Sequence, residues 1–345
     1  MTPNLPRMET LTEERPPAPR VAESPPAPAA RSTPVALLVA MRPSEWIKNL
    51  LVFAGLLFSQ KLDQSPQVVD AAVTFVAFCA ISSAGYLFND LCDAPFDRRH
   101  PEKRRRPIAS GALATPLAWG SAAVLTVIGV GVALAAVSAE VAGFVALYGV
   151  ITVAYSLVIK RLVILDVMTI ASLFILRVVA GAVAVEAHAS QWLLLCTAML
   201  ALFLGFTKRR QEAMSEESMP AASSSVREPE ATVHPAEPDA GAAGSQVTRP
   251  VLEHYSLPFL DQTVAMVTAA AIMSYAIYAV NSPLIGSRML ATAPSVLYGI
   301  FRYLYLIYDR QDTRSTAAIL TRDPGMIFAG VTWVGAALAM LYVFD

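Results

Sequence analysis

Apolar blocks of roughly twenty residues recur along most of this chain, separated by short polar stretches. A block of that length matches an α-helix crossing a hydrocarbon layer about 30 Å thick, because each helical residue advances about 1.5 Å. The blocks predict about nine transmembrane helices, near 46–62, 70–91, 115–137, 141–158, 164–184, 190–207, 263–281, 289–307 and 326–343. The chain is therefore expected to be a polytopic membrane protein.

The fold class that this pattern favours is all-α, a bundle of membrane helices. A transmembrane β-barrel would instead show short segments of alternating polarity. Composition agrees, since 55% of the 345 residues are hydrophobic and 15% are charged, whereas soluble domains carry about 25% charged residues. The formal net charge of −1 provides no basic field for nucleic acid, so no nucleic-acid partner is expected. Cys79, Cys92 and Cys196 fit neither a disulfide framework nor metal-ligand spacing.

Two polar segments stand apart from the apolar blocks. Residues 1–34 hold nine prolines and residues 213–250 hold five. Neither segment has enough apolar side chains to offset the entropy lost on ordering. We expect a disordered tail at 1–34, with no cleavable signal peptide because an apolar h-region is missing. The membrane domain then spans 35–345 and contains a disordered cytoplasmic insert at 213–250.

The basic residues predict the orientation in the membrane, because Lys and Arg in short loops are retained in the cytoplasm. One side carries Arg98–Arg106, Lys160, Arg161, Lys208–Arg210, Arg310, Arg314 and Arg322, and the other carries Lys61 and Arg288. With nine helices, the N-terminus is expected in the cytoplasm and the C-terminus outside. The predicted location is the cell (inner) membrane, with the functional groups facing the cytoplasm.

Acidic side chains cluster at the end of the second predicted helix. On a helix, Asp90, Asp93 and Asp97 fall within about 60° of one another, with Asn89 at the edge of the same face. Carboxylates and an amide oxygen are hard ligands that suit Mg²⁺, which commonly completes its shell with substrate phosphates. The spacing therefore predicts a magnesium-diphosphate site, unless these are only polar residues where a helix meets water. Pro95 disfavours helical geometry at Ala94 and predicts a kink or an end before Asp97.

Basic residues accompany the acids. Lys103, Arg104 and Arg106 follow them directly and, as a group, suit phosphate oxygens. The competing interpretation is a loop that only fixes the orientation. Lys48 in the first block either extends to the membrane surface or faces the same anion. Arg177 lies eleven positions beyond Asp166, about 16 Å deeper on nearly the same face. A charge at that depth usually faces the bundle interior, so we expect it to line a substrate path or to make a structural pair.

Two further polar groups lie near the same rim. Tyr155, Lys160 and Arg161 close the fourth predicted helix, and Asp166 opens the fifth. Lys208 and Arg209 close the sixth and are followed by Glu212. Lys208 and Glu212 are four residues apart and are equally compatible with a helix-surface pair.

These motifs resemble the UbiA superfamily of intramembrane prenyltransferases. The resemblance rests on Asn89-Asp90-x-x-Asp93-x-x-x-Asp97-Arg98 and on His100-Pro101-x-Lys103-Arg104-x-Arg106-Pro107-Ile108-Ala109-Ser110-Gly111. Further motifs resemble the decaprenyl-phosphate phosphoribosyltransferase branch: Arg42-Pro43-x-x-Trp46-x-Lys48-Asn49, Tyr155-Ser156 with Lys160, Asp166, Leu176-Arg177 with Ala180-Gly181, and Lys208-Arg209-x-x-Glu212. Aromatic prenyltransferases usually carry a second acidic motif where this chain has 208–212.

The resemblance implies a transferase that moves 5-phosphoribose from 5-phosphoribosyl 1-diphosphate to a polyprenyl phosphate and releases pyrophosphate. It implies Mg²⁺ on Asn89, Asp90, Asp93 and Asp97, the last three acting in catalysis. The substrate-binding residues that it implies are Lys48, Asn49, Lys103, Arg104, Arg106, Tyr155, Lys160, Arg161, Asp166, Arg177, Lys208, Arg209 and Glu212.

The alternative function is prenyl transfer from a polyprenyl diphosphate to an aromatic acceptor such as 4-hydroxybenzoate. A transporter is disfavoured because the charges gather on one rim. The sequence leaves the oligomeric state and the acceptor's chain length open.

Overall fold

A computed structural model describes residues 32–100, 103–217, 254–282 and 286–343. All of them belong to one compact unit, Ser32–Asp345. With η marking 3-10 helices, the elements are α1 (Thr33–Met41), η1 (Pro43–Phe53), α2 (Ala54–Leu57), α3 (Ser65–Asp97), η2 (Lys103–Arg105), α4 (Thr115–Ala136), α5 (Ala139–Leu157), η3 (Ile159–Arg161), α6 (Leu165–Ala184), α7 (Gln191–Glu217), α8 (Leu257–Val280), η5 (Gly286–Thr292), α9 (Ala293–Tyr308), α10 (Thr316–Arg322) and α11 (Pro324–Tyr342).

The predicted all-α membrane fold is confirmed. Within the described ranges, eight helical segments are long and apolar enough to cross a membrane, and they correspond to the second through ninth predicted spans. Many begin with a proline in the first turn, as in α3, α4, α8, α9 and α11. Proline is favoured there because the first N–H groups of a helix have no partner inside it. The protein is thus a multi-pass membrane protein.

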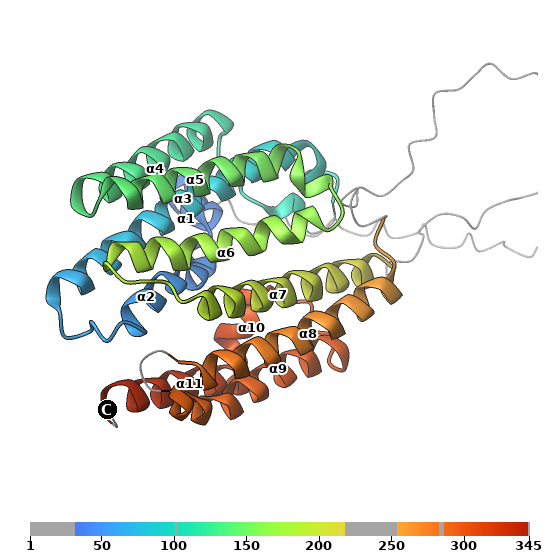
Figure 1. The fold of residues 1–345 in the computed structure, drawn as a ribbon. Helices are drawn as coiled ribbons and strands as arrows, with labels where there is room; N and C mark the ends of the chain where they lie inside the picture. Colours follow the sequence, from blue (N-terminus) through green and yellow to red (C-terminus); the bar gives the residue numbers. More distant parts are fainter. Residues whose placement is uncertain (1–31, 101–102, 218–253, 283–285, 344–345) are drawn as a thin grey trace, which may run out of the picture. The chain divides into compact units, whose positions relative to one another are not determined.

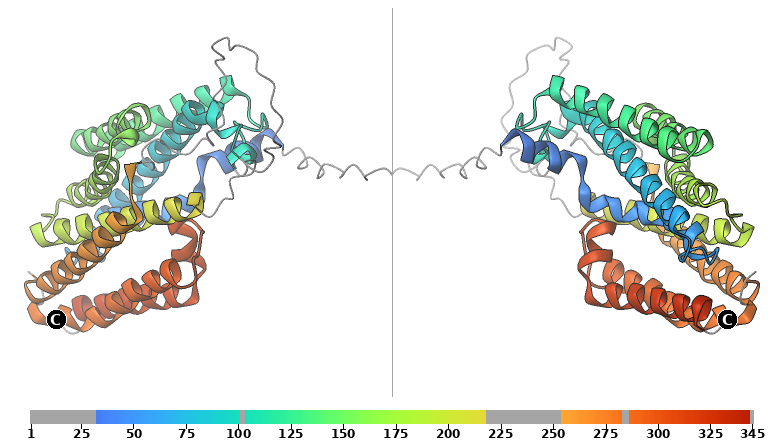
Figure 2. Two further views of the ribbon diagram at one scale, coloured as in Figure 1. Left: turned by 90° about the vertical axis from the view of Figure 1, so that its right-hand side faces the viewer. Right: turned by 90° about the vertical axis from the view of Figure 1, so that its left-hand side faces the viewer.

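The long helices pack side by side in a regular order (Figure 1). Helix α4 packs on α3 and α5, α6 packs on α5 and α7, and α8 packs on α7. Helices α9 and α11 pack on each other, and Figure 2 shows them on the opposite side of α7 from α3 and α4. The short helix α10 lies against η1. Segments distant in sequence therefore meet at the ends of α3, α6 and α7.

The first predicted span differs most from the structure. Residues 46–62 do not form one α-helix, because the chain breaks at Arg42 (φ 54°) and continues as the 3-10 helix η1 and the single turn α2. With three residues per turn, a 3-10 helix places every third side chain on one face. On η1 that face carries Trp46, Asn49 and Val52, and Asn49 and Val52 are buried. The buried face explains why this segment departs from α-helical geometry.

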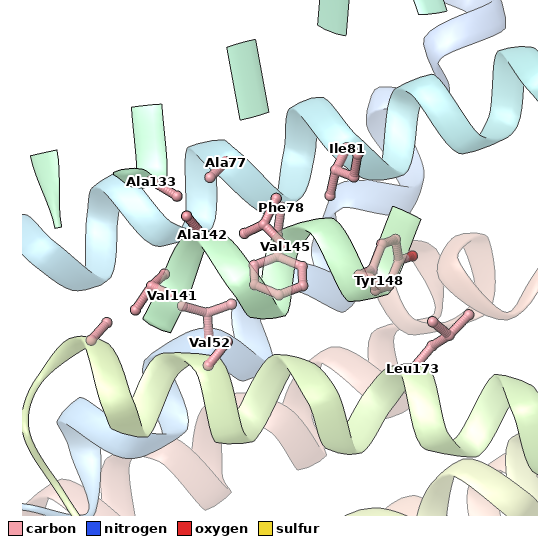
Figure 3. Close-up of a cluster of buried hydrophobic side chains, with 12 residues drawn as sticks. Val52, Ala77, Phe78, Ile81, Ala133, Val141, Ala142, Val145, Tyr148 and Leu173 are labelled. Carbon is pink, nitrogen blue, oxygen red and sulfur yellow. The ribbon is translucent and has the colours of Figure 1, made fainter. Parts of the chain in front are cut away.

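Close backbone contact fixes η1 against α6. A β-carbon on Gly181 would lie 1.9 Å from the carbonyl oxygen of Val52. Only glycine allows this approach, since it lacks a β-carbon. Val52 also belongs to a buried apolar cluster with Phe78 of α3 and Tyr148 of α5, shown in Figure 3. The Phe78 and Tyr148 rings pack edge to face with centroids 5.5 Å apart. The cluster holds η1, α3, α5 and α6 together.

Three boundary predictions have different outcomes. The expected end at Pro95 is wrong, because α3 runs on to Asp97 and the Arg98 N–H donates to the Ala94 carbonyl, whereas the alternative of a kink there stays a prediction. The tail at 1–34 lies outside the described residues except for its last positions, where α1 begins at Thr33. The insert at 213–250 also lies outside them beyond Glu217, the last residue of α7.

Candidate active site

The predicted face of acidic residues forms at the end of α3. Asn89, Asp90, Asp93 and Asp97 occupy its last three turns, and we refer to them as the acid face. Asp90 and Asp97 are buried, whereas Asp93 is partly exposed. Buried carboxylates require compensating charges or hydrogen bonds. The acid face receives both from three separate segments of the chain.

Two arginines compensate Asp90 and Asp97. Arg42, between α1 and η1, contacts Asp90 at 2.7 Å. Arg106, after η2, contacts Asp90 at 3.2 Å and Asp97 at 2.8 Å, so it bridges the two carboxylates. Burial alone would lower the pKa of Arg42, but the Asp90 carboxylate, together with Tyr86 and Glu45, outweighs burial and raises it. Two guanidinium groups therefore lie against the acid face.

A lysine compensates the third carboxylate. The Lys160 ammonium of η3 contacts Asp93 at 2.5 Å and lies 3.4 Å from the Asn89 amide oxygen. The Asn89 amide nitrogen donates to the other Asp93 oxygen at 3.0 Å. Three elements that are distant in sequence thus place one cation each on the acid face.

An open pocket adjoins this charged group. It has a volume of about 320 Å³ and is lined by Val39, Arg42, Asp90, Arg105, Arg106 and Pro107. Its wall combines one carboxylate with three cations, a composition suited to an oxyanion. The pocket also extends to α1, a helix that the sequence did not predict.

A second polar layer lies one helical turn deeper. Tyr86 precedes Asn89 and Asp90 by three and four residues, so it continues the acid face toward the bundle interior. The Arg42 guanidinium lies over its ring, 5.0 Å from the centroid. Lys48 on η1 contacts Glu45 at 2.6 Å. The Arg42 side chain therefore connects the acid face to this deeper layer.

Arg177 is the deepest cation, as the sequence predicted, and it lies inside the bundle. Its guanidinium donates to the Asn49 amide oxygen (2.7 Å), the Tyr148 hydroxyl (2.7 Å) and the Leu173 carbonyl (2.9 Å). It also lies over the Tyr148 ring. All these partners are neutral, so Arg177 contributes a buried positive charge to the interior behind Lys48.

A separate ion-pair network ties α6 to α7. Arg209 contacts Asp166 at 2.6 Å and Glu212 at 2.5 Å, and it donates to the Tyr155 hydroxyl at 3.1 Å. Arg209 and Asp166 are both buried. Glu212 thus pairs with Arg209, and the Lys208 ammonium lies 3.5 Å from the Gln211 amide oxygen. Arg209 is held by three side chains, one each from α5, α6 and α7 itself.

Tyr255, just before α8, completes this network. Its hydroxyl donates to Asp166 at 2.8 Å and accepts from the Ile164 N–H at 2.6 Å. Burial, supported by the bond to Asp166 and opposed by the one from Ile164, raises the pKa of Tyr255. Ile164 itself has φ 68° and ψ −47°, and the Leu165 N–H donates to the Val163 carbonyl at 2.8 Å. This is the strained γ-turn with positive φ, which bulky side chains rarely adopt.

Three predicted cations lie at the outer edge of the site. Arg104 and Arg161 are exposed, and Lys103 is partly exposed with its backbone N–H donating to the His100 ring at 3.3 Å. Their positions beside Arg106 and Lys160 leave room for contact with a large anion. The expectation for the cysteines is also met, since Cys79, Cys92 and Cys196 are free thiols.

The part of the chain that is similar to known proteins contains most residues of this site. A model of the UbiA prenyltransferase family matches residues 49–213, which contain the acid face and the Asp166–Arg209 network. Over 245 residues the chain is 32% identical to decaprenyl-phosphate phosphoribosyltransferase of Corynebacterium glutamicum, an alignment that covers 70% of this chain and 66% of that protein. The chain belongs to the UbiA prenyltransferase family.

Two further similarities support this assignment. The UbiA family chain is 37% identical over 180 residues to decaprenyl-phosphate phosphoribosyltransferase of Mycolicibacterium smegmatis, covering 51% of this chain and 56% of that protein. The aligned part thus spans less than two thirds of either relative. Its fold matches a UbiA homologue from Archaeoglobus fulgidus, solved with DMAPP and Mg²⁺, with a TM-score of 0.62 and 17% identity over 89% of this chain and 99% of that one.

The donor set of this UbiA family member suits a hard cation. The acid face offers three carboxylates and one amide oxygen, the ligand type that Mg²⁺ prefers. In the described part of the chain, however, no three His, Cys, Asp or Glu side chains are grouped as a metal cage. Arg42, Arg106 and Lys160 contact the three carboxylates instead, with Arg106 between Asp90 and Asp97. The acid face has the ligand types that bind Mg²⁺, and it becomes available to the ion when Arg42, Arg106 and Lys160 move from the carboxylates to another anion.

Sequence reasoning missed several residues of the UbiA site. Arg42 begins the motif at residues 42–49, yet its pairing with Asp90, 48 residues away, depends on how α1 and α3 pack. Tyr86 could have been found from its helical register with Asn89 and Asp90. Glu45 lies three residues before Lys48, a spacing that pairs side chains on a helix. For Tyr255, no motif or spacing in the sequence indicates that it joins the Asp166–Arg209 network.

Proposed function

We propose that this UbiA family member transfers 5-phosphoribose from 5-phosphoribosyl 1-diphosphate to a polyprenyl phosphate. The observation that carries the proposal is the charge arrangement: one group of carboxylates surrounded by the cations Arg42, Arg106 and Lys160. Two phosphorylated substrates need more positive charge than a prenyl diphosphate and a neutral ring. Similarity to two decaprenyl-phosphate phosphoribosyltransferases supports the same assignment.

In this proposal Asn89, Asp90, Asp93 and Asp97 hold Mg²⁺. The bound ion would neutralise charge that develops on the leaving diphosphate. The protein's own contribution is to keep these four oxygen-bearing side chains on one helix face, with Asp90 lining the adjoining pocket.

Arg42, Arg106 and Lys160 take the phosphate oxygens of the donor. Each contacts a carboxylate of the acid face within 3.2 Å, so a small side-chain movement moves it to an anion on that face. Arginine suits this role because its planar fork binds two phosphate oxygens at once. Lys103, Arg104 and Arg161 border the same region and are assigned to the outer phosphate groups.

The deeper layer receives the lipid phosphate. Lys48 is partly exposed and can contact an oxyanion, whereas Arg177 is buried and holds Asn49 and Tyr148. We therefore assign direct contact to Lys48 and a supporting electrostatic role to Arg177. The polyprenyl tail extends into an apolar groove between helices, in contact with membrane lipids.

The Asp166–Arg209 network has a positioning role. Arg209 contacts Tyr155, Asp166 and Glu212, so the contribution of these residues to substrate binding is to hold the end of α5 and the start of α6 against α7. Lys208, next to Arg209 on α7, is assigned to phosphate contact. In this proposal Lys208 contacts the substrate, whereas the residues paired with Arg209 hold the helices in position.

The chain then needs no strong general base. The acceptor phosphate is already ionised, and its oxygen forms a bond to the anomeric carbon as the bond from that carbon to the diphosphate breaks. The leaving oxygen keeps the bonding electrons. Fixed cations around the pocket stabilise the charge as it moves, which is the main way that prearranged electrostatics lower a barrier. The site faces the cytoplasm in this proposal, where the soluble donor is available.

A paired assay tests the proposal. Detergent-purified protein with Mg²⁺ is given 5-phosphoribosyl 1-diphosphate plus polyprenyl phosphate, or polyprenyl diphosphate plus 4-hydroxybenzoate. The expected product is a lipid-linked phosphoribose that disappears on chelation. A prenylated aromatic product alone would replace the proposal by aromatic prenyl transfer, and no product in either mixture would refute both.

A further inference from the structure

Glu45 is a carboxylate in the deeper layer with no role in the transfer as described so far. It lies on η1 three residues before Lys48, and the three-residue repeat of a 3-10 helix stacks the two side chains on one face. Their charged groups are 2.6 Å apart, with 14% of the Glu45 side chain exposed. Glu45 is therefore partly enclosed, and one face remains accessible.

Its neighbours place Glu45 beside the acid face. Glu45 interacts electrostatically with Arg42 and with Tyr86. The same Arg42 contacts Asp90 at 2.7 Å and covers the Tyr86 ring. Arg42 therefore contacts Asp90 of the acid face and interacts electrostatically with Glu45 on η1.

A carboxylate at this position discriminates between donors by chemistry. The hydrocarbon of a prenyl diphosphate would desolvate Glu45 and offer no hydrogen bond in return, which is unfavourable. A pentose offers hydroxyl groups, which donate to a carboxylate in strong, charge-assisted hydrogen bonds. One Glu45 oxygen contacts the Lys48 ammonium at 2.6 Å, and the carboxylate has a second oxygen and further lone pairs that can accept hydrogen bonds from hydroxyl groups.

We infer that Glu45 binds the ring hydroxyls of the transferred pentose and makes η1 a sugar-recognition subsite, with Lys48 positioning the carboxylate. The inference rests on the proposed phosphoribosyl transfer and adds the residue that selects a polyhydroxylated group over an allylic one. A purely structural Glu45–Lys48 pair, by contrast, would affect all donors equally.

The test compares donors within each variant. Wild-type protein, Glu45→Gln and Glu45→Ala are assayed with the ribosyl donor and with its 2-deoxy and 3-deoxy analogues, and the ratios of kcat/KM are determined. The wild type should prefer the ribosyl donor over at least one analogue by roughly 10- to 100-fold, as expected for a charge-assisted hydrogen bond. Glu45→Ala should reduce that preference to about threefold or less, with Glu45→Gln between them. Because each ratio is internal, partial loss of folded protein does not alter it.

The control is Glu140→Gln, an exposed glutamate in the first turn of α5, which should keep the wild-type ratio. An unchanged preference in Glu45→Ala would overturn the inference while leaving phosphoribosyl transfer intact. A wild type that transfers no phosphoribose at all would overturn the proposed function, and the inference with it.

Discussion

The Arg209 guanidinium and the Asp166 carboxylate are 2.6 Å apart, and both side chains are buried. The pair joins α7 to α6 across 43 residues of sequence. A buried ion pair is costly to form, yet removing one partner costs still more because the other charge is left uncompensated. Arg209 therefore has a structural role at the edge of the site, where it holds α7 against α6.

Replacing Arg209 by methionine should lower the free energy of unfolding by about 3–5 kcal/mol, because Asp166 would remain buried without its cation. Unfolding of the purified protein in mixed detergent micelles measures the change. Lys208→Met, one position earlier and partly exposed, is the matched control and should cost less than about 1 kcal/mol. Equal effects at the two positions would contradict the assignment.

Asp93→Ala should abolish turnover while leaving the protein folded. Asp93 is the most exposed carboxylate of the acid face, and without it the Lys160 ammonium keeps the Asn89 amide oxygen as a partner, so the substitution removes a metal ligand and leaves the helix end in place. We expect activity to fall by a factor of about 100 or more, given the several kcal/mol that a metal ion contributes. Asp70→Asn, at the other end of α3, serves as the control in the same assay. Near-normal activity in Asp93→Ala would exclude it as a ligand.

Chelation of divalent metal should stop the reaction with little effect on stability. Arg42, Arg106 and Lys160 already compensate the carboxylates of the acid face, so the fold does not depend on a metal to separate them. The midpoint of thermal unfolding with EDTA should lie within a few degrees of that with Mg²⁺, although turnover is lost. A large drop would mean that the ion pairs do not compensate these charges.

Gly181→Ala should destabilise the contact between η1 and α6. A methyl group there would meet the Val52 carbonyl at 1.9 Å, and overpacking of this kind costs about 1–3 kcal/mol or more. The same substitution at Gly143 meets no atom within 4 Å and should be neutral or mildly stabilising. Proteolysis near residues 43–57 during thermal unfolding reports the loosening. Equal behaviour of the two variants would argue against the close approach.

The helices and the acid face were predictable because both depend on local periodicity. A run of about twenty apolar residues determines a span, and a spacing of three and four places Asp90, Asp93 and Asn89 on one face. The first span was misjudged because hydropathy does not distinguish an α-helix from a 3-10 helix. Its geometry comes from Asn49 and Val52 packing on other helices.

Local sequence patterns did not predict which side chains from distant helices pair with each other. The sequence grouped Arg209 with the phosphate-binding cations, yet its contacts to Asp166 and Tyr155 come from residues 43 and 54 positions away. Likewise, nothing near Tyr255 indicates that it hydrogen-bonds to Asp166, 89 residues earlier. Such pairs depend on how distant helices pack, which a single sequence does not reveal.

The γ-turn at Ile164 sets an order of events during biosynthesis. Its unfavourable backbone is held by the Tyr255 hydroxyl, which emerges from the ribosome 91 residues later. Until then, the start of α6 lacks that anchor, and Asp166 has neither Tyr255 nor, before residue 209, its arginine. The rim at α6 therefore reaches its final shape only after residue 255 has been synthesised.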